Sequence, residues 1–304
     1  MNEVNETVPA RALCRFYIPG VGARLGGVYA GHVVDLTARE PALCASLAAL
    51  LSAPSGALDD VLRRYAGAAP DFEFAALDRA PAPDVPHLLA PIDAQEVWAA
   101  GVTYTRSREA RMGESEASAD VYARVYDAER PELFFKATAA RVAGPNAAVV
   151  ARSDAAWTVP EPELTLLLDA RLAVAGYTIG DDLTARDIEG QNPLYLPQAK
   201  VYDRGCALGP LIVPADALDP YALAIRCEIR RQGRALFEGT TNTGVLHRRL
   251  DTLVVYLGRH NQFPAGAYLM SGTGIVPPDD VALRSGDEIV ITIAGLGTLR
   301  NVVA

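Results

Sequence analysis

The second half of this chain is dominated by short apolar segments of the β-strand type. From Leu133 onward, runs rich in valine, isoleucine, leucine and tyrosine are separated by turn sequences such as RQGR and LRSGD. The expected strands are LFFKA, AAVVAR, ELTLLLDARLAVAGYTIGDD, CALGPLIVP, LAIRCEIRRQGRALFEG and EIVITIAGLGTLRNVV. One helix is expected in TGVLHRRLDTLVVYLGRH, where apolar residues recur every three or four positions. This succession predicts a β-rich α+β fold with few helices in its larger part.

The first third of the chain is organised differently. Residues 12–36 favour short strands separated by glycine, and residues 41–66 have the periodicity of helices. The proline-rich segment Ala80–Ile92 follows, and we expect it to be a linker that runs over the surface. A chain of 304 residues suits a small N-terminal α+β domain, residues 1–90, and a larger catalytic domain, residues 91–304.

Charge and composition argue against several classes of partner. The formal net charge of −9 disfavours nucleic acid and an anionic membrane. The start of the chain is polar, and no apolar run approaches the ~20 residues that a membrane span needs. The four cysteines form no Cys-x-x-Cys pair, which is typical of buried or incidental thiols in a reducing compartment. We therefore expect a cytoplasmic protein that acts on a small molecule.

The segment PEPELTLLLD carries the main chemical signal. Alternate residues of a strand point the same way, so Glu161 and Glu163 should present both carboxylates on one face. Two like charges that enter an apolar run are unfavourable unless something neutralises them. Carboxylate oxygens suit Mg²⁺, with Mn²⁺ or Ca²⁺ as alternatives. The other interpretation is an exposed strand edge, which Pro162 would also suit.

Further polar residues follow at the end of the next expected strand. In GYTIGDDLTARDIEG, Asp182 could complete a set of three carboxylates, although Gly-Asp-Asp is also common turn chemistry. Lys200 ends NPLYLPQAK, a stretch that we expect to be too rich in proline for a helix. A lysine near a metal-bound oxo acid could pair with a carboxylate or move a proton, and an ordinary surface lysine is the alternative.

The order of these motifs resembles the catalytic domain of the fumarylacetoacetate hydrolase superfamily. Glu-x-Glu is followed by GYTIGDDLTARD, AK, LGP, SGTG and SGDEIVITIAGLGTLRN, so that the resemblance covers about residues 95–304. It implies a catalytic domain built as a mixed β-sheet roll, in a homodimer or a higher homo-oligomer. The metal ligands that it implies are Glu161, Glu163 and Asp182. The residues that would face the substrate are Arg186, Lys200 and Thr273.

A narrower resemblance is to the dehydratases of 2-keto-3-deoxy-D-arabinonate, equivalently xylonate. It is carried by RPELFFKAT, VPEPEL and IEGQNPLYLPQAKVYD, and it includes Tyr195 among the expected substrate contacts. It implies a Mg²⁺-dependent hydro-lyase that converts a 2-oxo acid of this kind to 2,5-dioxopentanoate. In that branch a glutamate before the Phe-Phe-Lys strand acts with the lysine near the metal, which implies Glu132 and Lys200 as the catalytic pair. A surface acid that begins a strand is the alternative for Glu132.

One departure from the superfamily pattern bears on the reaction. Hydrolytic members usually carry a His-Glu pair after a Gly-x-x-Tyr strand, but here GVTY is followed by TRSREARMGESE, which has no histidine. This favours dehydration, although Glu114 or Glu116 could supply an acid or base if residues 105–131 form a lid and not a solvated helix. The other functions considered are hydrolysis or decarboxylation of an acylpyruvate, and sugar-acid binding without turnover.

Overall fold

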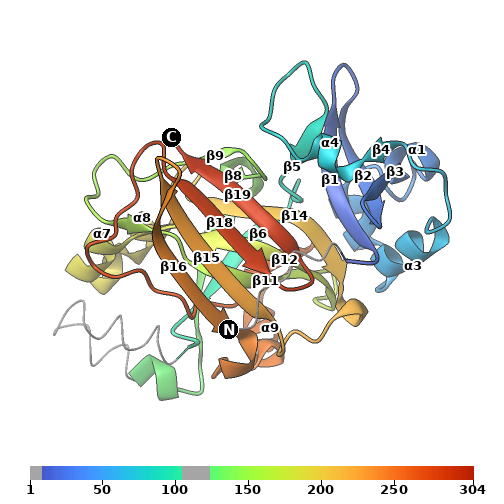
Figure 1. Cartoon of the computed structure of the whole chain (residues 1–304). Coiled ribbons are helices and arrows are strands. Elements are labelled where there is room, and N and C mark those ends of the chain that lie inside the picture. Colours follow the sequence, from blue (N-terminus) through green and yellow to red (C-terminus); the bar gives the residue numbers. More distant parts are fainter. Residues whose placement is uncertain (1–8, 105–123) are drawn as a thin grey trace.

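Most strands of the molecule belong to one large, mixed sheet (Figure 1). The computed structural model describes residues 9–104 and 124–304. Along the sheet the order is β4 (Phe72–Glu73), β3 (His32–Asp35), β2 (Gly22–Tyr29), β1 (Ala12–Ile18), β14 (Cys206–Pro214), β12 (Val174–Asp182), β11 (Pro162–Leu168), β17 (Ala267–Met270), β6 (Glu96–Gly101) and β7 (Glu132–Thr138). Two short strands join from the side: β5 (His87–Leu89) pairs with β1, and β8 (Val142–Ala143) pairs with β14. The pairings β6–β17 and β8–β14 are parallel, and the other pairings of this sheet are antiparallel.

A second sheet packs against the middle of the first. Its order is β16 (Arg234–Asn242), β15 (Ala224–Arg231), β18 (Glu288–Ile293), β19 (Gly297–Val303) and β9 (Ala148–Val149). A two-stranded pair, β10 (Thr158–Val159) with β13 (Thr184–Ala185), lies next to the ends of β11 and β12. The β-rich α+β fold predicted from the strand patterns is confirmed.

Strand β11 is buried on both faces. Leu164, Leu166 and Leu168 belong to the core shared with the second sheet, which includes Ile225 of β15. Leu167, on the opposite face, belongs to a second core beneath the N-terminal helices. Because residues alternate along a strand, Glu163 points to the same side as Leu167 and away from the second sheet. The strand therefore carries its acids into an enclosed space.

The N-terminal part contains short helices that cover the second core, and in Figure 1 it forms a lobe beside the rest of the molecule. Its helices are α1 (Leu36–Arg39), α2 (Leu47–Ser52), α3 (Ala57–Arg64) and α4 (Phe74–Leu77). Helix α2 begins after Ser46, whose hydroxyl accepts a hydrogen bond from the backbone N–H of Ala49 at 3.0 Å. The helical pattern predicted for residues 41–66 is confirmed.

The expected surface linker over Ala80–Ile92 is wrong in its second half. There β5 pairs with β1, and Leu88, Ala90 and Ile92 are buried. The apolar side chains of this segment pack against other apolar side chains and are thereby removed from water. In a solvated surface linker they would stay exposed to water. The domain boundary near Ala90 stays a prediction. Strands β1 and β14 lie on either side of this boundary in the sequence, yet they are neighbours in one sheet.

The remaining helices lie in the larger part of the chain. They include α7 (Arg186–Gln191), α8 (Leu196–Lys200) and α9 (Leu250–Leu257), and residues 124–127 are also helical. The 3₁₀ turns include η1 (Ala139–Arg141), η2 (Pro193–Tyr195), η3 (Ala215–Ala217) and η4 (Thr243–Val245). The helix expected over residues 243–260 is therefore shorter than its pattern suggested. Within the described ranges, no helix is long and apolar enough to cross a membrane. The predicted lid, with Glu114 and Glu116, lies mostly outside the described residues.

Candidate metal centre

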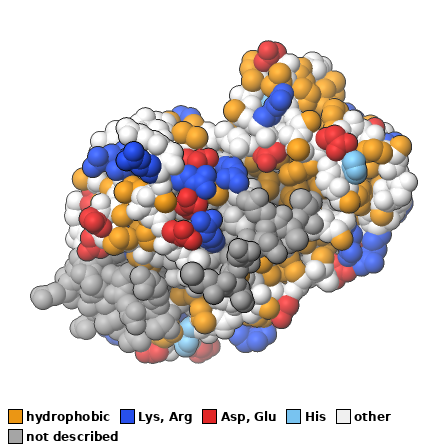
Figure 2. All heavy atoms as spheres, viewed as in Figure 1, with side chains coloured by type: hydrophobic (Ala, Val, Ile, Leu, Met, Phe, Trp, Pro, Cys, Tyr) orange, Lys and Arg blue, Asp and Glu red, His pale blue; other side chains and the backbone are white. Residues whose placement is uncertain are grey.

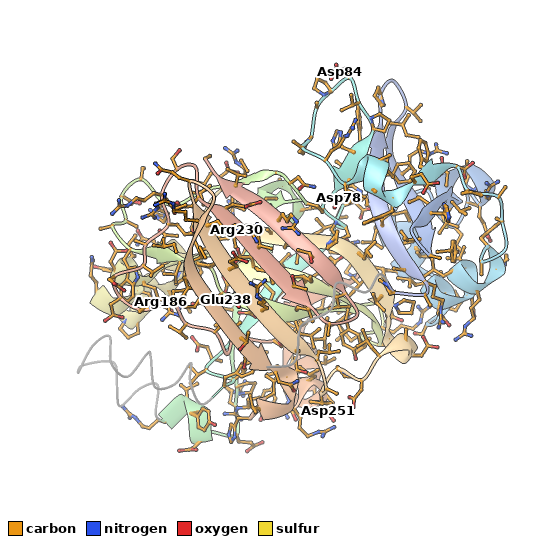
Figure 3. All side chains as sticks on the ribbon, in the orientation of Figure 1. Asp78, Asp84, Arg186, Arg230, Glu238 and Asp251 are labelled. Carbon is orange, nitrogen blue, oxygen red and sulfur yellow. The ribbon has the colours of Figure 1, made fainter. Side chains whose placement is uncertain are left out.

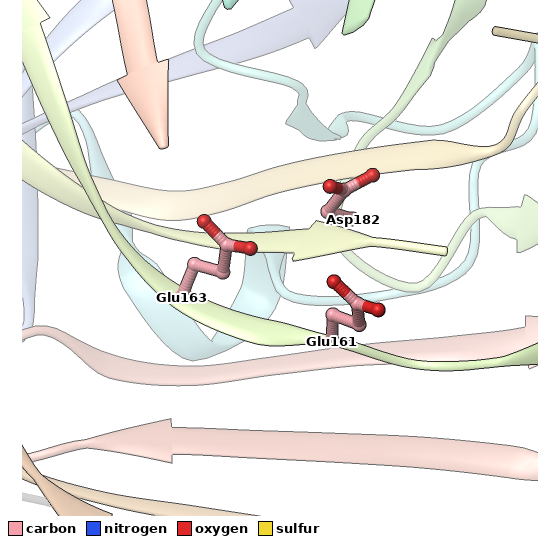
Figure 4. A group of neighbouring side chains, drawn as sticks. All are labelled: Glu161, Glu163 and Asp182. Carbon is pink, nitrogen blue, oxygen red and sulfur yellow. The ribbon is translucent and has the colours of Figure 1, made fainter. Parts of the chain in front are cut away.

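Three carboxylates meet where β11 and β12 lie side by side. Glu161 immediately precedes β11, Glu163 is its second residue, and Asp182 is the last residue of β12. One oxygen atom from each carboxylate lies within 4.8 Å of the others, and all three side chains are buried. Figure 4 shows these side chains projecting from neighbouring strands towards one another. The strand alternation expected for Glu161 and Glu163 and the addition of Asp182 thus give one compact acidic cluster.

The backbone around this cluster is tied at several points. The N–H of Asp182 donates to the carbonyl of Glu161 at 3.0 Å, and the N–H of Glu161 donates to Asp181 Oδ1 at 3.0 Å. The N–H of Gly272 donates to Glu163 Oε2 at 2.5 Å. Gly272 has a φ of +89°, and a side chain there would also collide with Thr103. The Gly-Thr loop recognised in SGTG therefore contributes a backbone donor to the cluster.

Two basic side chains reach the acids from α7 and α8. Lys200 Nζ lies 2.9 Å from Glu161 Oε2 and 2.8 Å from Asp182 Oδ2. Arg186 Nη2 donates to Glu161 Oε1 at 2.8 Å. Both basic side chains are 1% exposed, so these contacts are made away from bulk water. Lys200 was predicted as a catalytic residue and Arg186 as a substrate-facing residue, and both lie against the acidic cluster.

The helix that carries Lys200 was not expected. The proline content of NPLYLPQAK argues against a helix, but η2 and α8 each have a proline at their first or second position. Proline is tolerated there, because the N–H that it lacks would have no partner within the helix. This short helix turns Lys200 inward, where an extended segment would have allowed a surface position.

The electrostatics of Glu163 indicate a place for a cation. Burial raises the pKa of Glu163 well above its usual value, and the charges of Asp182 and Glu161 raise it further. Lys200 and the Gly272 N–H act in the opposite direction and do not compensate. Three buried carboxylates, one of which keeps a raised pKa beside the neighbouring cations, offer the oxygen donors that a hard divalent cation prefers. The residues present therefore fit Mg²⁺.

The other predicted substrate residues are placed differently from one another. Thr273 is buried next to Gly272, and its Oγ1 lies 3.1 Å from the N–H of Ile275, from which it accepts a hydrogen bond. Tyr195 ends η2 at the surface and is 41% exposed. The substrate contacts of both residues stay predictions.

Glu132 lies at the start of β7 and on the same strand face as Phe134. The Phe134 ring centroid lies 5.4 Å from Lys200 Nζ, so this face of β7 is turned towards the lysine. The carboxylate of Glu132 occupies the space that a side chain at residue 101 would need, and this residue is glycine. The geometry is compatible with the expected pairing of Glu132 with Lys200.

Lys136 is a residue of this site to which the sequence motifs assigned no role. It is fully buried, and its Nζ contacts Asp182 Oδ1 at 2.5 Å. It stands in the middle of LFFKA, where the strand pattern gave no sign that its side chain would turn towards the acids. A charged residue in an otherwise apolar strand was the available signal, because a charge is rarely buried without a partner.

Comparison with known proteins identifies relatives of this chain. The model of the fumarylacetoacetate (FAA) hydrolase C-terminal family matches residues 96–304. A probable 2-keto-3-deoxyxylonate dehydratase of Haloferax volcanii is 50% identical over 216 residues, which are 71% of this chain and 74% of the relative. The 2-dehydro-3-deoxy-D-arabinonate dehydratase of Saccharolobus solfataricus is 47% identical over 213 residues, or 69% and 72% of the two chains. A solved structure of 2-keto-3-deoxy-D-arabinonate dehydratase, complexed with magnesium and 2,5-dioxopentanoate, superposes with a TM-score of 0.78 at 34% identity, covering 96% of this chain and 98% of the other.

Proposed function

The chain belongs to the fumarylacetoacetate hydrolase family, and we propose that it is a Mg²⁺-dependent dehydratase of a 2-keto-3-deoxy pentonate. The observation that carries this proposal is the buried group of Glu161, Glu163 and Asp182 with Lys200 Nζ against two of them. The dehydratase names of the curated relatives support the choice of reaction.

The three carboxylates would hold the metal ion. Bound Mg²⁺ supplies Lewis-acid polarisation of the keto group of a 2-oxo acid. Arg186 keeps the carboxylate of Glu161 in place through its contact with Oε1, and the Gly272 N–H does the same for Glu163. These contacts orient the acids within a buried site.

The proton transfers would belong to Lys200 and Glu132. One of them removes a proton from C3 of the substrate, and the other donates a proton to the hydroxyl group that leaves C4 as water. The product of this elimination has a C3–C4 double bond, and it tautomerises to 2,5-dioxopentanoate, which carries an aldehyde. The shared orientation of Glu132 and Phe134, with Lys200 Nζ above the Phe134 ring, supports the assignment of this pair.

A substrate panel tests the proposal. The purified protein is incubated with 2-keto-3-deoxy-D-arabinonate, 2-keto-3-deoxy-D-xylonate, an acylpyruvate and oxaloacetate, each with Mg²⁺ and with EDTA. We expect 2,5-dioxopentanoate from a pentonate only in the presence of Mg²⁺, and no cleavage of the acylpyruvate. Cleavage of the acylpyruvate with no dehydration of either pentonate would replace this proposal with the hydrolase alternative. Mg²⁺ binding without turnover of any substrate would favour a sugar-acid-binding protein.

Two further properties stay predictions from the sequence. These are assembly into a homodimer or a higher homo-oligomer, and a cytoplasmic location. Light scattering on the purified protein and fractionation of cells that express it would test them.

A further inference from the structure

The proposed reaction gives Lys136 no role, yet its ammonium group contacts several groups of the site. Its ammonium group lies 2.5 Å from Asp182 Oδ1, 2.6 Å from the carbonyl oxygen of Lys200 and 2.9 Å from the carbonyl oxygen of Leu183. The ring centroid of Tyr202 lies 5.7 Å away on another side. The two carbonyl oxygens accept hydrogen bonds from Nζ, and the contact with Asp182 Oδ1 is an ion pair. Lys136 thus places a buried positive charge against the carboxylate while it holds the two carbonyl groups.

Lysine is very rare in this chain. Of its 28 lysine and arginine residues, only Lys136 and Lys200 are lysines, and both contact Asp182. Everywhere else the chain carries its positive charge on arginine. A lysine ammonium is a compact point charge with three donors, whereas a guanidinium is a wide planar fork. The chain thus has lysine only at the two positions where a compact cation meets the same buried carboxylate.

The two lysines hold opposite sides of Asp182. Lys136 binds Oδ1 and Lys200 binds Oδ2, so the carboxylate has little freedom to rotate. Lys136 also holds the backbone carbonyl of Lys200, which fixes the end of α8 relative to β7. A bulge in β7, where the pairing with β6 shifts between Phe135 and Ala137, places Lys136 out of the regular strand alternation. One side chain therefore sets the position of a proposed metal ligand and of a proposed catalytic residue.

We propose that Lys136 is a positioning residue, whose ammonium group orients Asp182 for the metal ion and Lys200 for proton transfer. The inference rests on the proposed function, since it concerns the same site. It assigns to Lys136 no contact with the substrate and no proton transfer of its own. A purely structural role, in which Lys136 only neutralises buried charge, is the alternative that the test must exclude.

The first test compares Lys136→Met with Arg231→Met. Methionine keeps the apolar stem of Lys136 and removes its ammonium group. Arg231, at the end of β15, is the control, because it pairs with Asp287, a carboxylate as buried as Asp182, although Arg231 itself is 30% exposed. We expect Lys136→Met to weaken Mg²⁺ binding, measured by calorimetry without substrate, by ~10–100-fold, as is usual when a partner of a metal ligand is removed. At saturating Mg²⁺ we expect kcat to fall with KM unchanged, because Lys200 is no longer held.

The control separates positioning from stability. Both variants should lower the thermal midpoint, and only Lys136→Met should change Mg²⁺ affinity and kcat. If Lys136→Met lowers the midpoint as Arg231→Met does, yet keeps the wild-type Mg²⁺ affinity and kcat, Lys136 has a structural role only and the proposal is overturned.

A second measurement does not depend on the folding of Lys136→Met. Wild-type protein labelled with ¹⁵N at the lysine ammonium groups should give two such signals, one for each lysine. Comparison with Lys200→Met assigns them. During a Mg²⁺ titration we expect both signals to move at the same metal concentration. A Lys136 signal that stays fixed while the Lys200 signal moves contradicts the proposal. Mg²⁺ binding is measured here without turnover, so an absence of dehydratase activity would overturn the proposed function alone.

Discussion

Two clusters of charged side chains in this molecule have the same chemistry and opposite electrostatics. The buried cluster joins the acids of β11 and β12 to Lys136, Lys200 and Arg186. The exposed cluster lies on the outer face of the second sheet, where basic and acidic spheres alternate in Figure 2 and where Figure 3 labels two of its members. The exposed cluster consists of Arg226, Glu228, Arg230 and Glu238, of which Glu228 is itself buried.

The pKa of Glu163 in the buried cluster shifts in the opposite direction from the pKa values of Glu228 and Glu238 in the exposed cluster. A hydrogen bond from Arg230 lowers the pKa of Glu228, and one from Arg226 lowers the pKa of Glu238. In the buried cluster, burial raises the pKa of Glu163 in spite of the nearby lysine. Arginine contacts stabilise the charged forms of both acids of the exposed cluster, whereas the cation near Glu163 does not offset the effect of its burial. The raised pKa of Glu163 therefore marks the buried cluster as the candidate functional site.

The largest effect is expected from Glu161→Ala. Without this carboxylate the site loses a proposed ligand, so we expect dehydration to fall below detection. Mg²⁺ at a hundredfold excess over its Kd should stabilise the wild-type protein by about 2.7 kcal/mol, and the variant should lose this stabilisation. Activity assays and thermal unfolding with and without Mg²⁺ measure both effects. Glu238→Ala, in the exposed cluster, is the control and should keep both properties. A Glu161→Ala variant that still turns over substrate and is still stabilised by Mg²⁺ would rule out this metal site.

A smaller effect, which depends on pH, is expected from Glu163→Gln. Because the pKa of Glu163 is raised on folding, the folded metal-free protein holds a proton that the unfolded chain releases. Stability should therefore fall as pH rises above the unfolded value of 4.5, by at most ~1.4 kcal/mol per pH unit, until the folded pKa is passed. Glutamine cannot ionise and should remove this loss.

Urea unfolding of the metal-free proteins at increasing pH measures this difference. The stability of Glu163→Gln relative to the wild type should grow as pH rises from 4.5. If the difference in stability between the two proteins is the same at every pH, folding does not raise the pKa of Glu163.

The smallest effect is expected from Glu238→Gln. Its side chain is 52% exposed, so its pair with Arg226 should contribute no more than ~1 kcal/mol, and less at high salt. Urea unfolding at low and high ionic strength measures it, with Mg²⁺ affinity as a second readout that should not change. If Glu238→Gln loses as much free energy of unfolding as the removal of a buried ion pair would cost, the two clusters do not differ in the way described.

Local patterns were sufficient for the strands and for part of the site. Period-two alternation predicted that the carboxylates of Glu161 and Glu163 lie on one side, and in the structure they meet, although Glu161 lies just before β11. Local patterns were misleading for the segment that contains Leu88 and Ile92. Its proline content predicted a surface linker, but both residues are buried. Local patterns also failed before Lys200, because proline breaks a helix only beyond its first turn.

By itself the sequence determined the strands, the orientation of the first two acids and the family to which their order belongs. These features depend on backbone geometry and on residues close together along the chain. Only the tertiary structure decided that Lys136 meets Asp182 and Lys200, since β7, β12 and α8 are distant in sequence and are joined by sheet order and packing. It also decided the burial that raises the pKa of Glu163, because burial depends on every element that covers the site.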